Sequence, residues 1–204
     1  MDSNHRRSHN LSEAQGQVLV RLARQTLMER LGIQIPQAEI DSLNVALKDS
    51  CFKSMCGTFV TLKIKERLRG CIGNLTSDTR LESGVRRNTI NAAFHDPRFE
   101  PLSTSDMDRV EIEISILSEP HPLKYRDGDD LVKKLRPHID GVIIRKGHAS
   151  ATFLPQVWEQ LPRPQDFLSH LCSKAGLSAD SWKNPELEVS TYQVQYFEEH
   201  AGQP

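Results

Sequence analysis

The chain has 204 residues, of which 37% are hydrophobic and 26% charged, so it can bury a sizeable core as one domain or two small lobes. It has no run of about 18 apolar residues, which excludes a membrane-spanning helix. Its 26 Lys and Arg against 27 Asp and Glu give a formal net charge of −1, without the overall basic excess that would hold a nucleic-acid backbone. Four cysteines behind a polar N-terminus argue against a secreted disulfide-bonded protein, and we expect a cytoplasmic location.

The N-terminal part of the chain is predicted to be helical. We expect residues 1–10 to form a disordered polar tail. Ser12 and Gln15 have the spacing of a capping box, which opens a helix, and Gly32 suits the position just past its end. Pro36 then starts a second, shorter helix.

After residue 57 the spacing of hydrophobic residues changes from a helical period to a period of two residues. Residues 60–64 alternate apolar and polar side chains, and a short polar link returns the chain into 68–75, which predicts a β-hairpin. A helix face begins at Leu81. This helix must end before Asp96, because the proline that follows disfavours a helical conformation there.

The second half of the chain continues with a clear strand. Apolar residues at 110, 112, 114 and 116 alternate with the polar Glu111, Glu113 and Ser115. This pattern predicts an antiparallel strand with one face exposed to solvent. Residues 119–128, rich in proline, glycine and charge, are the candidate for an internal linker or long loop between two structured parts.

Further secondary structure is predicted after residue 140. Segments 142–145 and 149–154 flank a Gly–His pair that suits a two-residue hairpin turn. Residues 164–177 favour a helix, and 192–196 favour a single final strand that closes the fold. Helices mixed with hairpins predict an α+β fold rather than a doubly wound parallel sheet.

The sharpest candidate for chemistry is the string LRGCIG at residues 68–73. In a regular strand Arg69 and Cys71 share one face, and a cation beside a thiol favours the reactive thiolate. Two glycines weaken a strand unless a ligand, another backbone or a bulge needs the space. The string therefore predicts a partly exposed, activated Cys71; the alternative is a small buried apolar residue, as is common for free cysteine.

Two further places carry polar groups with possible roles. Asp96 and Arg98 flank a proline at a helix end, a geometry typical of a structural ion pair and turn, and the adjacent His95 is a candidate general base. Gln156 follows the end of a predicted strand, where its amide either binds a ligand or closes the turn.

The familiar phosphate, dinucleotide and metalloprotease motifs are absent from the sequence, and we expect neither a metal nor a cofactor. Cys51, Cys56 and Cys71 lack the close Cys or His pair that would complete four zinc ligands. A group of basic residues is interpreted either as a solvated surface or as a basic patch, and no aromatic residue is interleaved with it to stack nucleic-acid bases. This group comprises Lys63, Lys65, Arg67, Arg69, Arg80, Arg86 and Arg87.

Six strings of this chain resemble the AMMECR domain family, whose prokaryotic members are called AmmeMemoRadiSam system protein A. The resemblance covers about residues 11–198 in the family's order, and LRGCIG is close to diagnostic of the family. The strings are GTFVTLK (57–63), LRGCIG with the following Asn-Leu (68–75), AAFHDPRFEPLS (92–103), DGVII (140–144), FLPQVW (153–158) and FLSHLCSKAGL (167–177).

The resemblance implies a fold of two α+β lobes. The larger lobe contains both termini around an antiparallel sheet, the smaller has its own short antiparallel sheet, and LRGCIG faces a cleft between them. Residues 11–198 then form a single domain of two subdomains, followed by a polar end at 199–204. Carried over by motif position, the site residues are Arg69, Gly70, Cys71, Ile72, Gly73, Asn88, Asp96, Pro97, Arg98, Phe99, Pro155 and Gln156.

The resemblance also implies partners, although no particular reaction. Prokaryotic members are associated with a Memo-like protein and a radical S-adenosylmethionine enzyme. We therefore interpret the chain as a component of a modification pathway that binds a bulky or macromolecular substrate between the lobes. In that role Cys71 is the nucleophile or transient acceptor, and Arg69 orients an anionic group or activates the thiol. The alternatives are a non-catalytic binding or scaffold protein and a protein associated with RNA modification.

Overall fold

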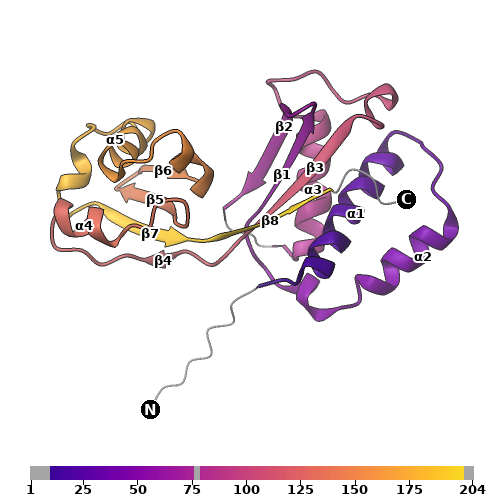
Figure 1. Cartoon of the computed structure of the whole chain (residues 1–204), viewed down its shortest axis with the longest axis horizontal. Coiled ribbons are helices and arrows are strands. Elements are labelled where there is room, and N and C mark those ends of the chain that lie inside the picture. Colours follow the sequence, from indigo (N-terminus) through magenta and orange to yellow (C-terminus); the bar gives the residue numbers. More distant parts are fainter. Residues whose placement is uncertain (1–9, 76–78, 200–204) are drawn as a thin grey trace, which may run out of the picture. The chain divides into compact units, whose positions relative to one another are not determined.

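A computed structural model describes residues 10–75 and 79–199 of the chain. The chain divides into two compact units, Met1–Leu117 with Gln195–Pro204, and Ser118–Val194. Each unit combines helices with its own antiparallel sheet, which confirms the predicted α+β class (Figure 1). Within the described ranges, no helix is long and apolar enough to cross a membrane.

The first unit begins with two helices whose ends follow the predicted signals. Helix α1 spans Glu13–Arg30, and Ser12 forms the predicted capping box with Gln15. Gly32 follows with a φ of 70°, a conformation that glycine adopts without steric cost. Helix α2 spans Gln37–Ala46, directly after Pro36.

The sheet of the first unit is built from the predicted hairpin and two further strands in the order β2-β1-β3-β8. The hairpin link is Lys65-Glu66, and both of these residues have positive φ. The strands are β1 (Thr58–Ile64), β2 (Arg67–Asn74), β3 (Val110–Leu117) and β8 (Val194–Glu198). The other elements are α3 (Leu81–Phe94) and the short 3-10 helices η1 (Ser50–Lys53) and η2 (Thr104–Asp106).

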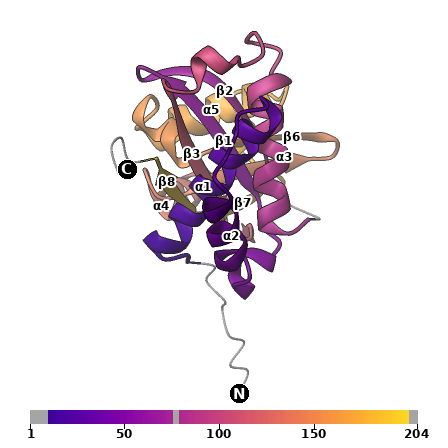
Figure 2. The same ribbon diagram turned by 90° about the vertical axis from the view of Figure 1, so that its right-hand side faces the viewer.

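Helices α1 and α3 pack together and against the sheet (Figures 1 and 2). Val60 and Leu62 of β1 share the core with apolar residues of both helices, as do the residues paired with them on β3. The face that carries Val60 and Leu62 is therefore the helix-covered face. Thr61 and Lys63 alternate with them and lie on the opposite face, here called the helix-free face.

One expectation for β3 is wrong. The alternation predicted a wet face at Glu111, Glu113 and Ser115, but Glu113 and Ser115 are buried. The Glu113 carboxylate forms an ion pair there with the Lys63 ammonium at 2.8 Å, and this pairing allows a polar side chain to be buried.

The second unit has a sheet in the order β4-β7-β5-β6. Its core includes Trp158, whose ring stacks on Phe167 with centroids 3.7 Å apart. The predicted hairpin turns at Gly147, which has a φ of 60°. The strands are β4 (His121–Pro122), β5 (Gly141–Lys146), β6 (Ala149–Phe153) and β7 (Glu188–Tyr192). The helices are α4 (Gly128–Lys134), η3 (Pro155–Glu159), α5 (Pro164–Lys174) and η4 (Ser181–Lys183).

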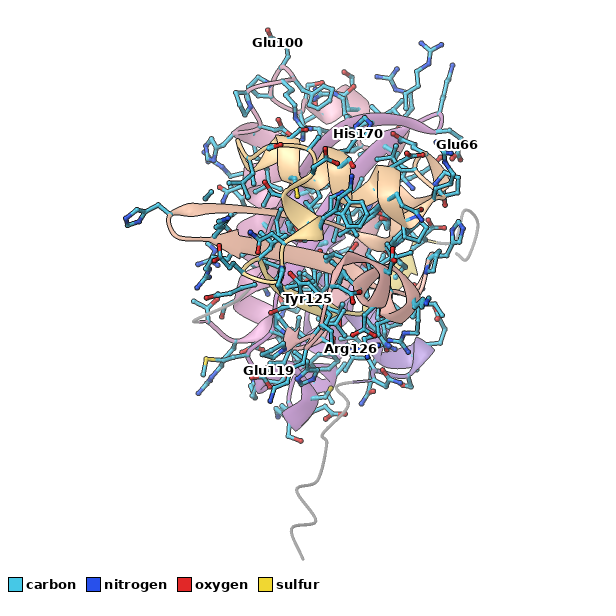
Figure 3. All side chains as sticks on the ribbon, turned by 90° about the vertical axis from the view of Figure 1, so that its left-hand side faces the viewer. Glu66, Glu100, Glu119, Tyr125, Arg126 and His170 are labelled. Carbon is cyan, nitrogen blue, oxygen red and sulfur yellow. The ribbon has the colours of Figure 1, made fainter. Side chains whose placement is uncertain are left out.

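Two segments, 119–128 and 192–196, differ in detail from the loop and the single strand that were predicted for them. The segment 119–128 begins the second unit and is attached to it, because Tyr125 donates from its hydroxyl to the Leu187 carbonyl at 2.5 Å (Figure 3). The single strand predicted at 192–196 is wrong. The chain forms β7 and β8, which belong to different sheets and are separated at Gln193.

Candidate functional site

Cys71 lies in the middle of β2, the edge strand of the first sheet. Its register partner on β1 is Thr61, so the Cys71 side chain lies on the helix-free face. The Thr61 hydroxyl donates a hydrogen bond to the Cys71 Sγ, with 3.4 Å between the two atoms. Cys71 is half-buried and belongs to neither hydrophobic core cluster, which argues against the interpretation that it is an apolar filler.

The backbone of Cys71 is held by side chains instead of a neighbouring strand. Its N–H donates to Asp96 Oδ2 at 2.9 Å, and its carbonyl accepts from the Arg98 guanidinium at 3.0 Å. An edge strand presents unpaired N–H and C=O groups on its open side, and this pair of side chains satisfies both groups at residue 71. Two of the strings that carry the resemblance, at 68–75 and 92–103, therefore meet at Cys71.

Asp96 and Arg98 form the structural ion pair that the sequence predicted, and both side chains also bind the backbone of Cys71. Two guanidinium nitrogens of Arg98 bind the Asp96 carboxylate at 2.9 and 2.7 Å, and the Arg98 N–H donates to it at 3.2 Å. The Arg98 guanidinium, followed by the Cys71 and Arg98 N–H groups, holds the pKa of Asp96 well below its usual range despite burial. The Asp96 side chain is 1% exposed and that of Arg98 is 54% exposed. A buried carboxylate therefore holds a guanidinium that is half-exposed to solvent.

Arg69 does not follow the regular alternation that was expected. The register between β1 and β2 shifts at Leu62/Lys63, and Arg69 has no register partner. Its guanidinium donates to the Pro101 carbonyl at 3.3 Å and lies 3.9 Å from Asp106 Oδ2. In the described part of the chain, its buried Nη1 has no hydrogen-bond partner. The guanidinium that contacts residue 71 is that of Arg98.

The two glycines of the string are explained by close internal packing. A Cβ at Gly70 would lie 2.1 Å from the Ala92 carbonyl oxygen, so glycine lets β2 approach the backbone of α3. A Cβ at Gly73 would lie 2.3 Å from the Phe59 ring. Ile72, between them, packs against the core of the first unit.

Asn88 lies in α3 and faces the sheet. It is 1% exposed, and its side-chain amide donates to the Thr58 carbonyl at 3.0 Å and to the Thr58 hydroxyl at 2.8 Å. These bonds join α3 to β1 beneath the Cys71 strand. Asn88 therefore supports the site from the helix-covered face.

Two further predicted positions, His95 and Gln156, belong to different units of the chain. His95 caps the end of α3 with an exposed ring, whose Nδ1 is 3.2 Å from Asn91 Oδ1. Gln156 lies in η3 of the second unit, next to the buried Pro155. His138, near the predicted Asp–Gly pair, has a φ of 64°.

Three of the seven residues of the predicted basic patch form ion pairs within the described part of the chain. Lys63 contacts Glu113, Arg69 lies near Asp106, and Arg86 lies 3.4 Å from Glu29. Partial burial lowers the pKa of Lys63, but the hydrogen bond and charge of Glu113 outweigh it and raise that pKa overall. These three paired cations are poorly placed to neutralise phosphates.

The thiols of the other three cysteines have raised pKa values. Burial raises the pKa of the Cys51 and Cys56 thiols to about 11, and it also raises the pKa of Cys172. All four cysteines are free. Among residues 10–75 and 79–199, no cluster of three or more His, Cys, Asp or Glu side chains is placed to hold a metal ion.

Sequence reasoning missed Thr61, Thr58 and Glu113. Thr61 pairs in register with Cys71 on one side and with Glu113 on the other, which forms a row across three strands. Only the alternation around residue 61 gave a signal, because it placed Thr61 and Lys63 on one face.

Comparisons with known proteins agree with the resemblance. The AMMECR1 family model matches residues 20–197. A protein of Methanothermobacter thermautotrophicus is 35% identical over 197 residues, which cover 93% of this chain and 96% of that protein. A protein of Methanopyrus kandleri is 36% identical over 199 residues, which cover 93% of this chain and 90% of that protein. The crystal structure of an uncharacterised protein from Pyrococcus horikoshii matches with a TM-score of 0.77 and 30% identity, over 93% of this chain and 94% of that one. The chain therefore belongs to the AMMECR1 family.

Proposed function

We propose that this protein is a component of a modification pathway in which Cys71 acts as a nucleophile or transient acceptor for a bulky substrate. The observation that supports this proposal is the convergence of two motif segments on Cys71. Asp96 and Arg98 hold its N–H and carbonyl groups on the open side of β2, while its side chain lies on the helix-free face and the residue is half-buried. A reactive group on a fixed backbone loses little freedom when a substrate binds, which favours reaction.

The residues around Cys71 either support its strand or are candidates for substrate recognition. Asn88, Gly70 and Ile72 support the strand from the helix-covered face, and Asp96 positions Cys71 through the backbone. Arg69 is the candidate for orienting an anionic group of the substrate, because it carries a fixed positive charge on the same strand as Cys71. Gln156 stays a substrate-binding prediction that follows from the resemblance.

The partners in this proposal are a Memo-like protein and a radical S-adenosylmethionine enzyme in the cytoplasm. This part rests on the resemblance to AmmeMemoRadiSam system protein A.

The first test asks whether Cys71 is a reactive thiol. The native protein is treated with a limiting amount of iodoacetamide at pH 8, and each cysteine is quantified by mass spectrometry of tryptic peptides. A Lys or Arg separates each cysteine from the next, so every cysteine reports separately. We expect Cys71 to be labelled at least about tenfold faster than Cys56 and Cys172, whose burial both shields the thiols and raises their pKa. Equal or slower labelling of Cys71 would contradict a role as nucleophile.

The second test separates catalysis from scaffolding. Wild-type protein and the Cys71→Ser variant are each combined with the purified Memo-like and radical enzymes, and both complex formation and the modified product are measured. The proposal predicts that Cys71→Ser keeps binding and loses product. If binding and product both survive, Cys71 is not catalytic and the non-catalytic binding protein is the correct alternative.

A further inference from the structure

We propose that Thr61 is a positioning residue that stabilises the thiolate form of Cys71 through a hydrogen bond from its side-chain hydroxyl. This inference deepens the proposed function and rests on it, because it concerns how the Cys71 thiol becomes reactive. It assigns the task of activation to the neighbouring strand β1, where the sequence pattern had pointed to Arg69.

The register of the hairpin brings the two side chains together. The Cys71 N–H donates to Asp96 and the Cys71 carbonyl accepts from Arg98, both on the open side of β2. Cys71 and Thr61 therefore form a non-hydrogen-bonded pair of the antiparallel ladder, the kind of pair whose side chains lie closer together. The distance of 3.4 Å between Thr61 Oγ1 and Cys71 Sγ follows from this pairing. The clamp by Asp96 and Arg98 thus fixes the strand at the residue that Thr61 contacts.

The Thr61 hydroxyl is directed to sulfur because no competing acceptor takes its proton. Within the described ranges, this hydroxyl makes one hydrogen bond, which is to Cys71 Sγ. The next acceptor along the row is the Glu113 carboxylate, which is engaged by the Lys63 ammonium at 2.8 Å. A hydroxyl with one donor proton can therefore serve the sulfur.

The chemical step is a simple proton loss followed by attack on carbon. The Cys71 thiol gives its proton to a base in solution, and the thiolate keeps the electron pair. The Thr61 O–H then donates to a charged acceptor, and such a hydrogen bond is stronger than one to a neutral thiol. With iodoacetamide as the probe, the thiolate forms an S–C bond while the C–I bond breaks and iodide leaves.

The charged groups around Cys71 are the same in every variant of the test. Asp96 and Arg98 approach from the segment after α3, while Lys63 of β1, Glu113 of β3 and Glu198 of β8 form a separate ion-pair group. A difference between variants at residue 61 therefore reports the hydroxyl and not a changed charge.

The test compares Thr61→Val, which keeps the branched shape and removes the hydroxyl, with Thr61→Ser, which keeps the hydroxyl. Iodoacetamide labelling of the Cys71 peptide is measured from pH 6 to pH 10. Because the lost hydrogen bond is to a charged acceptor but is partly exposed to solvent, we expect the pH midpoint of Cys71 labelling in Thr61→Val to move up by about one pH unit. Labelling at pH 7.5 then falls about tenfold, and Thr61→Ser restores most of it.

Internal controls separate this effect from misfolding. Cys51, Cys56 and Cys172 are labelled in the same samples and must keep their wild-type rates, and circular dichroism must keep the wild-type melting curve. Thr191→Val is the matched control, since Thr191 is a half-exposed threonine of β7 in the second unit.

Each outcome is decisive. An unchanged pH midpoint in Thr61→Val overturns the role of Thr61 even if Cys71 is reactive, and so does a Thr61→Ser profile equal to that of Thr61→Val. If wild-type Cys71 is itself unreactive across the pH range, the proposed function fails first, so the two failures are distinguishable.

Discussion

Replacing Asp96 with asparagine tests the physical basis of the site. The side chain keeps its size but loses its charge, and an amide offers one acceptor oxygen where the carboxylate offers two. In the wild type those oxygens accept from the Cys71 N–H, the Arg98 N–H and the Arg98 guanidinium. The amide NH₂ of the variant would face at least one of these donors, so that donor loses its partner.

The magnitude follows from what each lost contact leaves behind. A buried N–H left without an acceptor costs about 1–3 kcal/mol, and the Cys71 N–H meets this condition because Asp96 is buried. The Arg98 guanidinium is half-exposed and recovers much of its loss from water, so it adds at most about 1 kcal/mol. We therefore expect Asp96→Asn to lower the free energy of unfolding by about 3 kcal/mol, or roughly 6–12 °C in Tm for a chain of this size.

The pH dependence gives a second readout with a definite sign. The pKa of Asp96 is lowered in the folded state, so its charge contributes stability that is fully present above the ordinary aspartate pKa of about 3.9. That contribution is lost as the pH falls from there toward the folded-state value. The stability difference between wild type and Asp96→Asn must therefore be constant from about pH 5 to pH 8 and shrink below about pH 4.

Urea unfolding followed by circular dichroism measures both effects. Asp41→Asn is the matched control, because Asp41 is an exposed carboxylate on α2 and should change stability by less than about 0.5 kcal/mol. A loss below about 1 kcal/mol for Asp96→Asn at pH 7, or a difference independent of pH down to pH 3, would refute the reasoning.

Two further predictions concern the hairpin β1–β2. Gly70→Ala places a Cβ 2.1 Å from the Ala92 carbonyl oxygen, and we expect a loss of about 3 kcal/mol in urea unfolding. Gly84→Ala in α3, whose Cβ would keep an ordinary 3.4 Å contact, should be neutral or slightly stabilising; equal losses in the two variants would show that packing at β2 is not the cause. Lys65 and Glu66 both have positive φ, so replacing them with the turn pair Asn-Gly should stabilise the protein by about 1 kcal/mol, and a lower urea midpoint would contradict this.

Several elements were predictable because their signals act between near neighbours in the chain. The Ser12 capping box satisfies N–H groups within one helical turn, and Gly32 supplies a backbone conformation at a single residue. The alternation at 60–64 reports one strand face, and the Asp96–Arg98 ion pair spans two residues. Each needs only local geometry to be recognised.

The predictions that were wrong concern features that depend on contacts between residues distant in the chain. The register shift at Arg69 removed it from the expected alternation, and no residue type near it signals that irregularity. The strand predicted at 192–196 became two strands because its halves pair in different sheets. Glu113 was expected to be wet, and its burial depends on Lys63, 50 residues earlier.

The composition and motifs of these 204 residues by themselves determined the α+β class, the family and the focus on LRGCIG. Local sequence also indicated that the glycines needed space, although not whether a ligand, a bulge or another backbone occupied it. The tertiary structure decided that the Ala92 backbone and the Phe59 ring fill that space, and that Asp96 and Arg98 hold Cys71 in place while Thr61 contacts its sulfur. The physical reason is that hydrogen bonds at a sheet edge join groups 10 and 25 residues apart, whose meeting depends on strand register and on where α3 ends.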